Sequence, residues 1–228
     1  MDGTAMGWLE RLREWERRWR YGYRTDFSTP EDRRRAEIYI RWFDHGILRG
    51  RWTNGAEIAP GVFRSNQPTR ARYAAMKAAG VRSVLNLRGD EGDGPPLLMA
   101  REACAALRLH HVVAHLPGRR APAAEDILSL IAIFRDIERP FFMHCKSGAD
   151  RSGFAAAIYL MTCEGRSPAE ARRQLSARHL HFARSRAGVL GLILDRHAAS
   201  GLPLETWLRK DYDPQAIQAE FDQRRRQR

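Results

Sequence analysis

The residues best suited to chemistry lie in one short segment, PFFMHCKSGADRSGFAAAIYLM, at residues 140–161. An apolar run ends at Cys145, and Arg151 follows six residues later, where a helix is predicted to begin. The residues between them are mostly small, so the backbone can curl and direct its N–H groups at one point. Such a loop at a helix N-terminus binds a phosphate dianion and favours the thiolate form of a cysteine at its start.

The residue types in this loop predict separate roles. The thiolate of Cys145 can attack phosphorus, and Arg151 can hold two phosphate oxygens in a bidentate grip that tightens in the transition state. Ser152 can donate to the sulfur and make it a better leaving group, and His144 is predicted to support the loop through backbone groups. The predicted phosphate-binding residues are Lys146, Ser147, Gly148, Ala149, Asp150 and Arg151. This chemistry requires no metal and no cofactor.

The segment from His144 to Ser152 resembles the HC-x5-R-S/T motif of cysteine-based protein tyrosine and dual-specificity phosphatases. The stretches FRSNQP at 63–68 and VRSVLNLRG at 81–89 resemble the compact bacterial type of this family. The resemblance covers residues 56–200. It implies a phosphomonoester hydrolase that forms a phosphocysteine intermediate and acts on phosphorylated proteins, with phosphotyrosine as the leading side chain.

The general acid is where this sequence departs from the family. Most relatives carry an aspartate on a mobile upstream loop, but the corresponding region here, HHVVAHLPGRRAP, contains no Asp or Glu. Asp150 is the better candidate, because Cys-x4-Asp-Arg resembles the loops of myotubularin-type and Sac-type phosphoinositide phosphatases. A carboxylate beside bound phosphate is repelled by it and therefore holds a proton more readily. His115 is the alternative acid, since a protonated imidazole can also donate.

Two alternatives to a protein phosphatase stay open. Asp150, Lys146 and the net charge of +12 favour a phosphatase acting on phosphoinositides, phospholipids or inositol phosphates. Arg119 and Arg120, on the loop predicted to overhang the site, could contact such an anionic substrate. An inactive phosphate-binding module is the third reading, and the presence of both Cys145 and Arg151 argues against it.

The elements that must position the loop follow from the hydrophobic pattern. Four short apolar runs, at residues 61–65, 81–87, 111–115 and 141–145, are typical of buried strands. Amphipathic segments predict helices at residues 69–79, 95–108, 125–137, 151–163, 168–178 and 186–199. Strands that alternate with helices indicate an α/β fold, with a central, mostly parallel sheet flanked by helices as in dual-specificity phosphatases.

Both ends of the chain are predicted to be helical appendages of a catalytic domain at 56–200. The N-terminal extension, residues 1–55, begins with Trp8, Leu12, Trp15 and Trp19 on one face of a helix at 8–20. These side chains are expected to dock on the main domain; the alternative is peripheral contact with an anionic membrane. Residues 201–228 are expected to form a helical tail with a frayed end.

The composition and the N-terminal sequence predict the cellular compartment of the protein and exclude some partners. The N-terminus has no apolar segment with a cleavage site, and three cysteines, Cys104, Cys145 and Cys163, suggest no disulfide framework. We therefore expect a cytoplasmic protein. Cys163 and Cys104 are predicted to be core residues, and Cys104 is also a candidate to protect Cys145 through a reversible disulfide. No nucleic-acid-binding module is recognisable, so no nucleic acid partner is expected.

Overall fold

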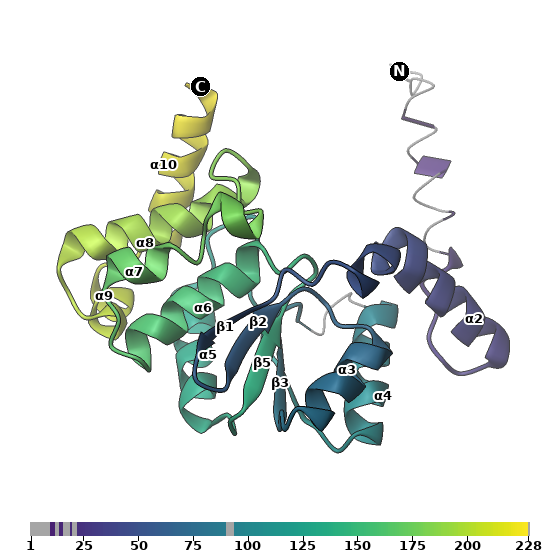
Figure 1. Cartoon of the computed structure of the whole chain (residues 1–228). Helices are drawn as coiled ribbons and strands as arrows, with labels where there is room; N and C mark the ends of the chain where they lie inside the picture. Colours follow the sequence, from purple (N-terminus) through teal and green to yellow (C-terminus); the bar gives the residue numbers. More distant parts are fainter. Residues whose placement is uncertain (1–9, 12–13, 16–18, 20–21, 90–93, 228) are drawn as a thin grey trace, which may run out of the picture.

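The computed structural model describes residues 10–11, 14–15, 19, 22–89 and 94–227. A five-stranded sheet in the order β1-β2-β5-β3-β4 forms its centre (Figure 1). Its strands are β1 (Ala56–Ala59), β2 (Val62–Ser65), β3 (Ser83–Asn86), β4 (His110–Val113) and β5 (Phe141–His144). β1 pairs antiparallel with β2, whereas the other pairings are parallel, which confirms the predicted sheet. The sequence prediction omits β1, an edge strand whose register shifts between Glu57 and Ala59.

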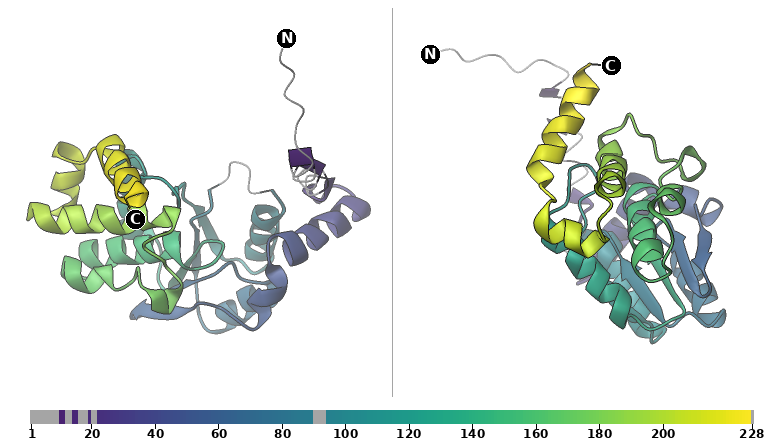
Figure 2. Two further views of the ribbon diagram at one scale, coloured as in Figure 1. Left: turned by 90° about the horizontal axis from the view of Figure 1, so that it is seen from above. Right: turned by 90° about the vertical axis from the view of Figure 1, so that its left-hand side faces the viewer.

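Helices cover both faces of this sheet (Figures 1 and 2). One face packs against α3 (Arg70–Ala78) and α4 (Gly94–Ala106), and the other against α5 (Ala124–Asp136) and α6 (Asp150–Thr162). Successive residues of a strand point to opposite faces. Phe141 accordingly lies in the larger core, beside residues of α5 and α6, while Phe142 lies in the smaller core with Tyr73 and Cys104.

The remaining helices pack beyond α6, and one of them is shorter than predicted. They are α7 (Pro168–Arg172), α8 (Val189–Ser200), α9 (Leu204–Lys210) and α10 (Pro214–Arg226). Ser167 and Glu170 form a capping box at the start of α7. This helix ends at Arg172 because the chain turns there, and the carbonyl of Gln174 instead accepts a hydrogen bond from Arg64 at 2.7 Å.

The C-terminal helices contribute side chains to the larger core. Trp207 of α9 and Phe221 of α10 are buried in the larger core. α10 begins at its cap, Asp213, and continues through Arg226. α10 packs through Ile217 and Phe221, whereas residues 223–227 are exposed.

The described part of the N-terminal extension contains helical segments that alternate with irregular stretches, such as residues 24–29 and 52–55. α2 (Pro30–Ile38) is capped by Thr29 and is followed by a π-helical turn (Tyr39–Phe43) and a 3-10 turn (Gly46–Gly50). Trp19 contacts Phe43, with ring centroids 5.1 Å apart, although it is still 47% exposed. Trp8 and Leu12 lie outside the described residues. In the described part of the chain, no helix is both long and apolar enough to cross a membrane.

Candidate active site

The loop from Cys145 to Ala149 joins the end of β5 to the start of α6. Gly148 adopts a φ of +73°, a conformation that side chains rarely tolerate. A Cβ atom at this position would lie only 2.6 Å from the backbone nitrogen of Asn66. Glycine therefore lets the loop close tightly against the end of β2.

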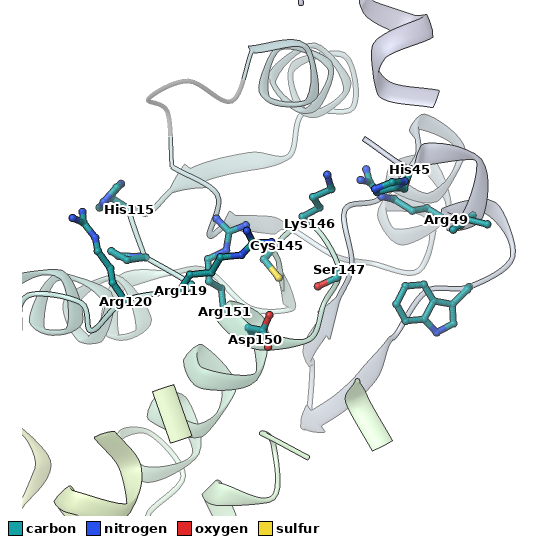
Figure 3. A pocket seen from close by; sticks show the side chains of 14 residues that line it. His45, Arg49, His115, Arg119, Arg120, Cys145, Lys146, Ser147, Asp150 and Arg151 are labelled. Carbon is teal, nitrogen blue, oxygen red and sulfur yellow. The ribbon is translucent and has the colours of Figure 1, made fainter. Parts of the chain in front are cut away.

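The loop forms the floor of a cavity of about 790 Å³ (Figure 3). One side is the segment containing His115 and Arg119, and the other is the segment containing His45 and Arg49. The cavity is lined by His45, Leu48, Arg49, Trp52, His115, Pro117, Gly118, Arg119, Arg120, Cys145, Lys146, Ser147, Asp150 and Arg151. Five of these side chains are Lys or Arg and only one is a carboxylate, so the cavity attracts anions.

The surroundings of Cys145 favour its thiolate. The residue is 2% exposed, and burial alone raises the pKa of its thiol. The positive charge of Arg151 and hydrogen bonds from the Ser152 hydroxyl, the Ser152 amide and the Gly148 amide outweigh burial and leave the pKa below its ordinary value. The loop and the start of α6 thus provide the positive field for a thiolate.

Arg151 is directed across this loop from the first turn of α6. Its Nη1 donates to the carbonyl oxygen of Leu87 at 3.3 Å. A Cβ added at Gly118 would approach the Arg151 stem to 3.1 Å, so the 117–120 loop lies directly on this side chain. Arg151 is therefore held between the end of the sheet and the overhanging loop, with its guanidinium beside Cys145 (Figure 3).

Arg64, on β2, braces the loop from below and was not among the residues predicted for the site. Its side chain is fully buried, and burial lowers its pKa to about 10. Its Nη2 donates to the carbonyl oxygens of Gly148 and Ala149 at 2.5 and 3.2 Å. These contacts turn the loop carbonyls away from the cavity. An arginine inside an otherwise buried strand is the sequence signal that marks this role.

Asp150 faces the cavity and is paired with a histidine that sequence reasoning missed. The Nδ1 atom of His181 lies 2.7 Å from Oδ1 of Asp150, and the His181 side chain is only 2% exposed. The Nε2 atom of His181 is buried with no partner among the described residues, so the Asp150 side is where this ring makes its hydrogen bond. His181 is 31 residues from Asp150, in an irregular segment with no local motif, so sequence alone gives no signal.

The N-terminal extension completes the opposite wall, which was not predicted. Asp44 is 2% exposed and pairs with Arg88 at 2.9 Å, with Arg49 at 2.5 Å and with Lys146 at 3.2 Å. Burial raises the pKa of this carboxyl, but the cations lower it further, to about 2. Asp44 thereby ties two cavity cations, Arg49 and Lys146, to each other.

A second link joins this segment to the loop. Nδ2 of Asn54 donates to the carbonyl oxygen of Ser147 at 3.0 Å and to that of His179 at 2.9 Å. The segment that carries His181 is thus anchored beside the loop from Cys145 to Ala149 by the N-terminal extension.

The other predicted residues lie as follows. His144 is fully buried and its Nε2 pairs with the Tyr73 hydroxyl at 3.2 Å; burial holds its pKa well below the ordinary value. His115 is exposed on the cavity wall. Cys104 is in the smaller core, apart from the larger core that contains Cys145, and burial raises its pKa to about 12. These positions give no contact between the two sulfur atoms, which are both free.

Comparison with known proteins identifies the family. The family model described as a DSP-PTPase phosphatase fused to NAD+ kinase matches residues 50–187, more than half of the chain. The chain belongs to this family. Membership in this dual-specificity-like branch of the cysteine-based phosphatases confirms the resemblance seen in the loop. No curated protein matches the chain.

Solved structures share the fold. The core catalytic domain of SIW14 from S. cerevisiae, described as a PP-IP phosphatase, is 12% identical with a TM-score of 0.51. The match covers 64% of this chain and 91% of that chain. Tk-PTP in its active form is 17% identical with a TM-score of 0.51, and 66% and 99% of the two chains are covered. At these identities the similarity concerns the fold alone.

Proposed function

We propose that the protein is a phosphomonoester hydrolase that works through a phosphocysteine intermediate on Cys145. The observation that carries this proposal is the position of Cys145 at the floor of a cavity lined with cations, where Arg151 and the loop amides lower the pKa of its thiol. A thiolate placed among N–H groups and beside Arg151 can attack phosphorus, and the same groups hold the phosphoryl oxygens.

In the first step, the sulfur of Cys145 forms a bond to phosphorus while the ester bond to the leaving oxygen breaks. Arg151 and the loop amides stabilise the equatorial oxygens of the transferring group. Asp150 is our candidate to give its proton to the leaving oxygen, because its carboxyl faces the cavity from the first position of α6. The Nδ1–H group of His181 fixes the carboxyl of Asp150 by donating a hydrogen bond to Oδ1.

In the second step, water attacks phosphorus and the S–P bond breaks, which returns the thiolate. Asp150, now ionised, accepts the proton of the water. Ser152 assists here, because its hydroxyl has one proton and two acceptors within reach: the sulfur of Cys145 and the carbonyl oxygen of Ser65 at 3.2 Å. Donation to the sulfur stabilises the thiolate as it leaves.

The cavity favours a substrate with more than one anionic group over a phosphotyrosyl protein. Arg49, Arg119, Arg120 and Lys146 line the cavity in addition to Arg151. Arg49 and Lys146 share the carboxylate of Asp44, but within the described residues no carboxylate pairs with Arg119 or Arg120. A single phosphate bound by the loop and Arg151 therefore leaves Arg119 and Arg120 for further anionic groups of the substrate. An inositol phosphate or phosphoinositide supplies further phosphates, and the fold is shared with a PP-IP phosphatase. A phosphotyrosyl protein stays the second candidate, since Trp52, Leu48 and Pro117 offer apolar surface for an aromatic ring.

We propose the cytoplasm as the location, because a free nucleophilic cysteine persists in a reducing compartment.

The experiment is a substrate panel with the purified protein and with Cys145→Ser as the blank. The panel contains p-nitrophenyl phosphate, a phosphotyrosine peptide, a phosphoserine peptide, a phosphoinositide and an inositol polyphosphate. We expect turnover of p-nitrophenyl phosphate and a higher kcat/KM for the multiply phosphorylated compounds. Turnover of no member of the panel would reject the proposed reaction, and a preference for the phosphotyrosine peptide would reverse the order of the two substrate classes.

A further inference from the structure

A second hollow adjoins the active-site cavity. It has a volume of about 300 Å³ and is lined by Arg119, Arg186, Gln218, Phe221, Asp222 and Arg225. Arg119 lines both this hollow and the active-site cavity, so the two are neighbours across one side chain. We propose that this hollow is a second anion-binding site, which takes another phosphoryl group of the same substrate. The inference rests on the proposed function. It adds the place where a second phosphoryl group of the substrate is bound.

Three guanidinium groups converge on this hollow from three separate elements. Arg119 comes from the 117–120 loop, Arg186 from the 3-10 turn Arg186–Gly188, and Arg225 from the last turn of α10. Guanidinium groups bind phosphate oxygens through several N–H donors at once, which suits them to such a site. Asp222 is the one carboxylate in the lining, and it accepts a hydrogen bond from Nε2 of Gln218 at 3.2 Å.

The arginines of the hollow have no acidic partner among the residues that the structure describes. Some exposed arginines elsewhere are paired with acidic side chains, as Arg82 is with Glu138 and Arg196 with Glu220. Within the described ranges, no carboxylate forms an ion pair with any of the three arginines of the hollow. Their charges are thus left for an external anion.

The hollow is held together by contacts from the C-terminal helices to the overhanging loop. Oε1 of Gln218 accepts from the amide of Ala121 at 2.9 Å, and the Tyr212 hydroxyl donates to the carbonyl oxygen of Pro122 at 2.7 Å. These bonds fix the base of the loop that carries Arg119. The same loop presses Gly118 against Arg151, so the second anion site and the reacting phosphate site have a defined spacing.

This site depends on residues beyond the family match. The family model ends at residue 187, whereas Gln218 and Arg225 lie on α10. The second anion site is therefore a property of this chain's C-terminal helices and would distinguish it from phosphatases that contain the catalytic domain alone.

The test measures competitive inhibition of p-nitrophenyl phosphate hydrolysis by two anions, inorganic phosphate and inositol hexakisphosphate. We expect Arg225→Glu and Arg186→Glu each to raise the inhibition constant of inositol hexakisphosphate about tenfold, equivalent to about 1.4 kcal/mol. The inhibition constant of inorganic phosphate and the kcat/KM of p-nitrophenyl phosphate should stay unchanged. Arg226→Glu is the matched control, because it makes the same change in net charge on the same helix outside the hollow.

Three results would overturn the second site. They are an unchanged constant for inositol hexakisphosphate, an equal rise for both inhibitors, or the same rise in the Arg226→Glu control. Calorimetric titration of inositol hexakisphosphate into the Cys145→Ser protein, with and without Arg225→Glu, measures the site without turnover. The wild type could fail to hydrolyse every phosphate compound while Arg225→Glu still weakens the binding of inositol hexakisphosphate. In that case the proposed reaction is rejected and the second anion-binding site is supported.

Discussion

His181 Nδ1 lies 2.7 Å from Asp150 Oδ1, and this contact joins the start of α6 to a distant segment at the edge of the cavity. The imidazole is buried and fixed, whereas the carboxylate is one-third exposed towards the cavity. We interpret His181 as a positioning residue, which holds Asp150 in the orientation needed to reach a leaving oxygen.

Replacing His181 should therefore affect the protonation step more than binding. His181→Leu removes the donor and should lower kcat about tenfold for substrates with poor leaving groups, with little change in KM. His181→Asn places an amide N–H near the position of Nδ1 and should recover most of the loss. Steady-state kinetics with a series of aryl and alkyl phosphates measures both variants. Equal losses for the two variants, or for all leaving groups, would contradict a positioning role.

Asp150→Asn should lower the rate by about a hundredfold for an alkyl phosphate and much less for p-nitrophenyl phosphate. The reason is that a good leaving group needs no proton as its bond to phosphorus breaks. The measurement is the dependence of kcat/KM on the pKa of the leaving alcohol, which should steepen in the variant. His115→Gln is the control for the alternative acid: a steeper dependence in His115→Gln and none in Asp150→Asn would move the acid to His115.

Ser152→Ala should shift the pH profile of kcat/KM. In the folded protein the pKa of the Cys145 thiol is lowered, and the Ser152 hydroxyl is one of the causes. Its removal raises that pKa towards the ordinary value, so the acidic limb of the profile should move to higher pH. Direct titration of the thiolate by its ultraviolet absorbance checks the same shift. If the acidic limb of the profile does not move, the Ser152 hydroxyl donates its hydrogen bond to the carbonyl oxygen of Ser65, and not to the sulfur, in the free enzyme.

Asp44→Asn should destabilise the protein and loosen the cavity. Removing one partner of a buried ion pair costs about 3–5 kcal/mol, and here Arg49, Arg88 and Lys146 all lose their shared carboxylate. The pKa of Asp44 is lowered to about 2, so its stabilisation is complete above the pKa of the unfolded chain and is lost as pH falls towards 2. Urea unfolding at a series of pH values measures this contribution. The difference in unfolding free energy between the wild type and Asp44→Asn should be largest at neutral pH and should shrink as the pH falls. An unchanged unfolding free energy at neutral pH would contradict the role of Asp44.

The local parts of the fold could be predicted, because their causes are local. Thr69 caps α3 and the alternation of Phe141 and Phe142 gives β5 its two buried faces. The loop from Cys145 to Arg151 carries its chemistry in seven consecutive residues. Contacts between distant segments have no such signal. Asp44 finds Arg88 and Lys146, and His181 finds Asp150, only after the chain has folded. The N-terminal wall of the cavity was missed for the same reason.

The central claim is that Cys145 carries the phosphoryl group during turnover. The most direct measurement is rapid quenching of the enzyme during hydrolysis of p-nitrophenyl phosphate, followed by mass spectrometry of its peptides. The account predicts one added phosphoryl group on the peptide that contains Cys145, and none on this peptide from the Cys145→Ala protein. Turnover by the Cys145→Ala protein, or a phosphoryl group on a different residue of the wild type, would contradict it.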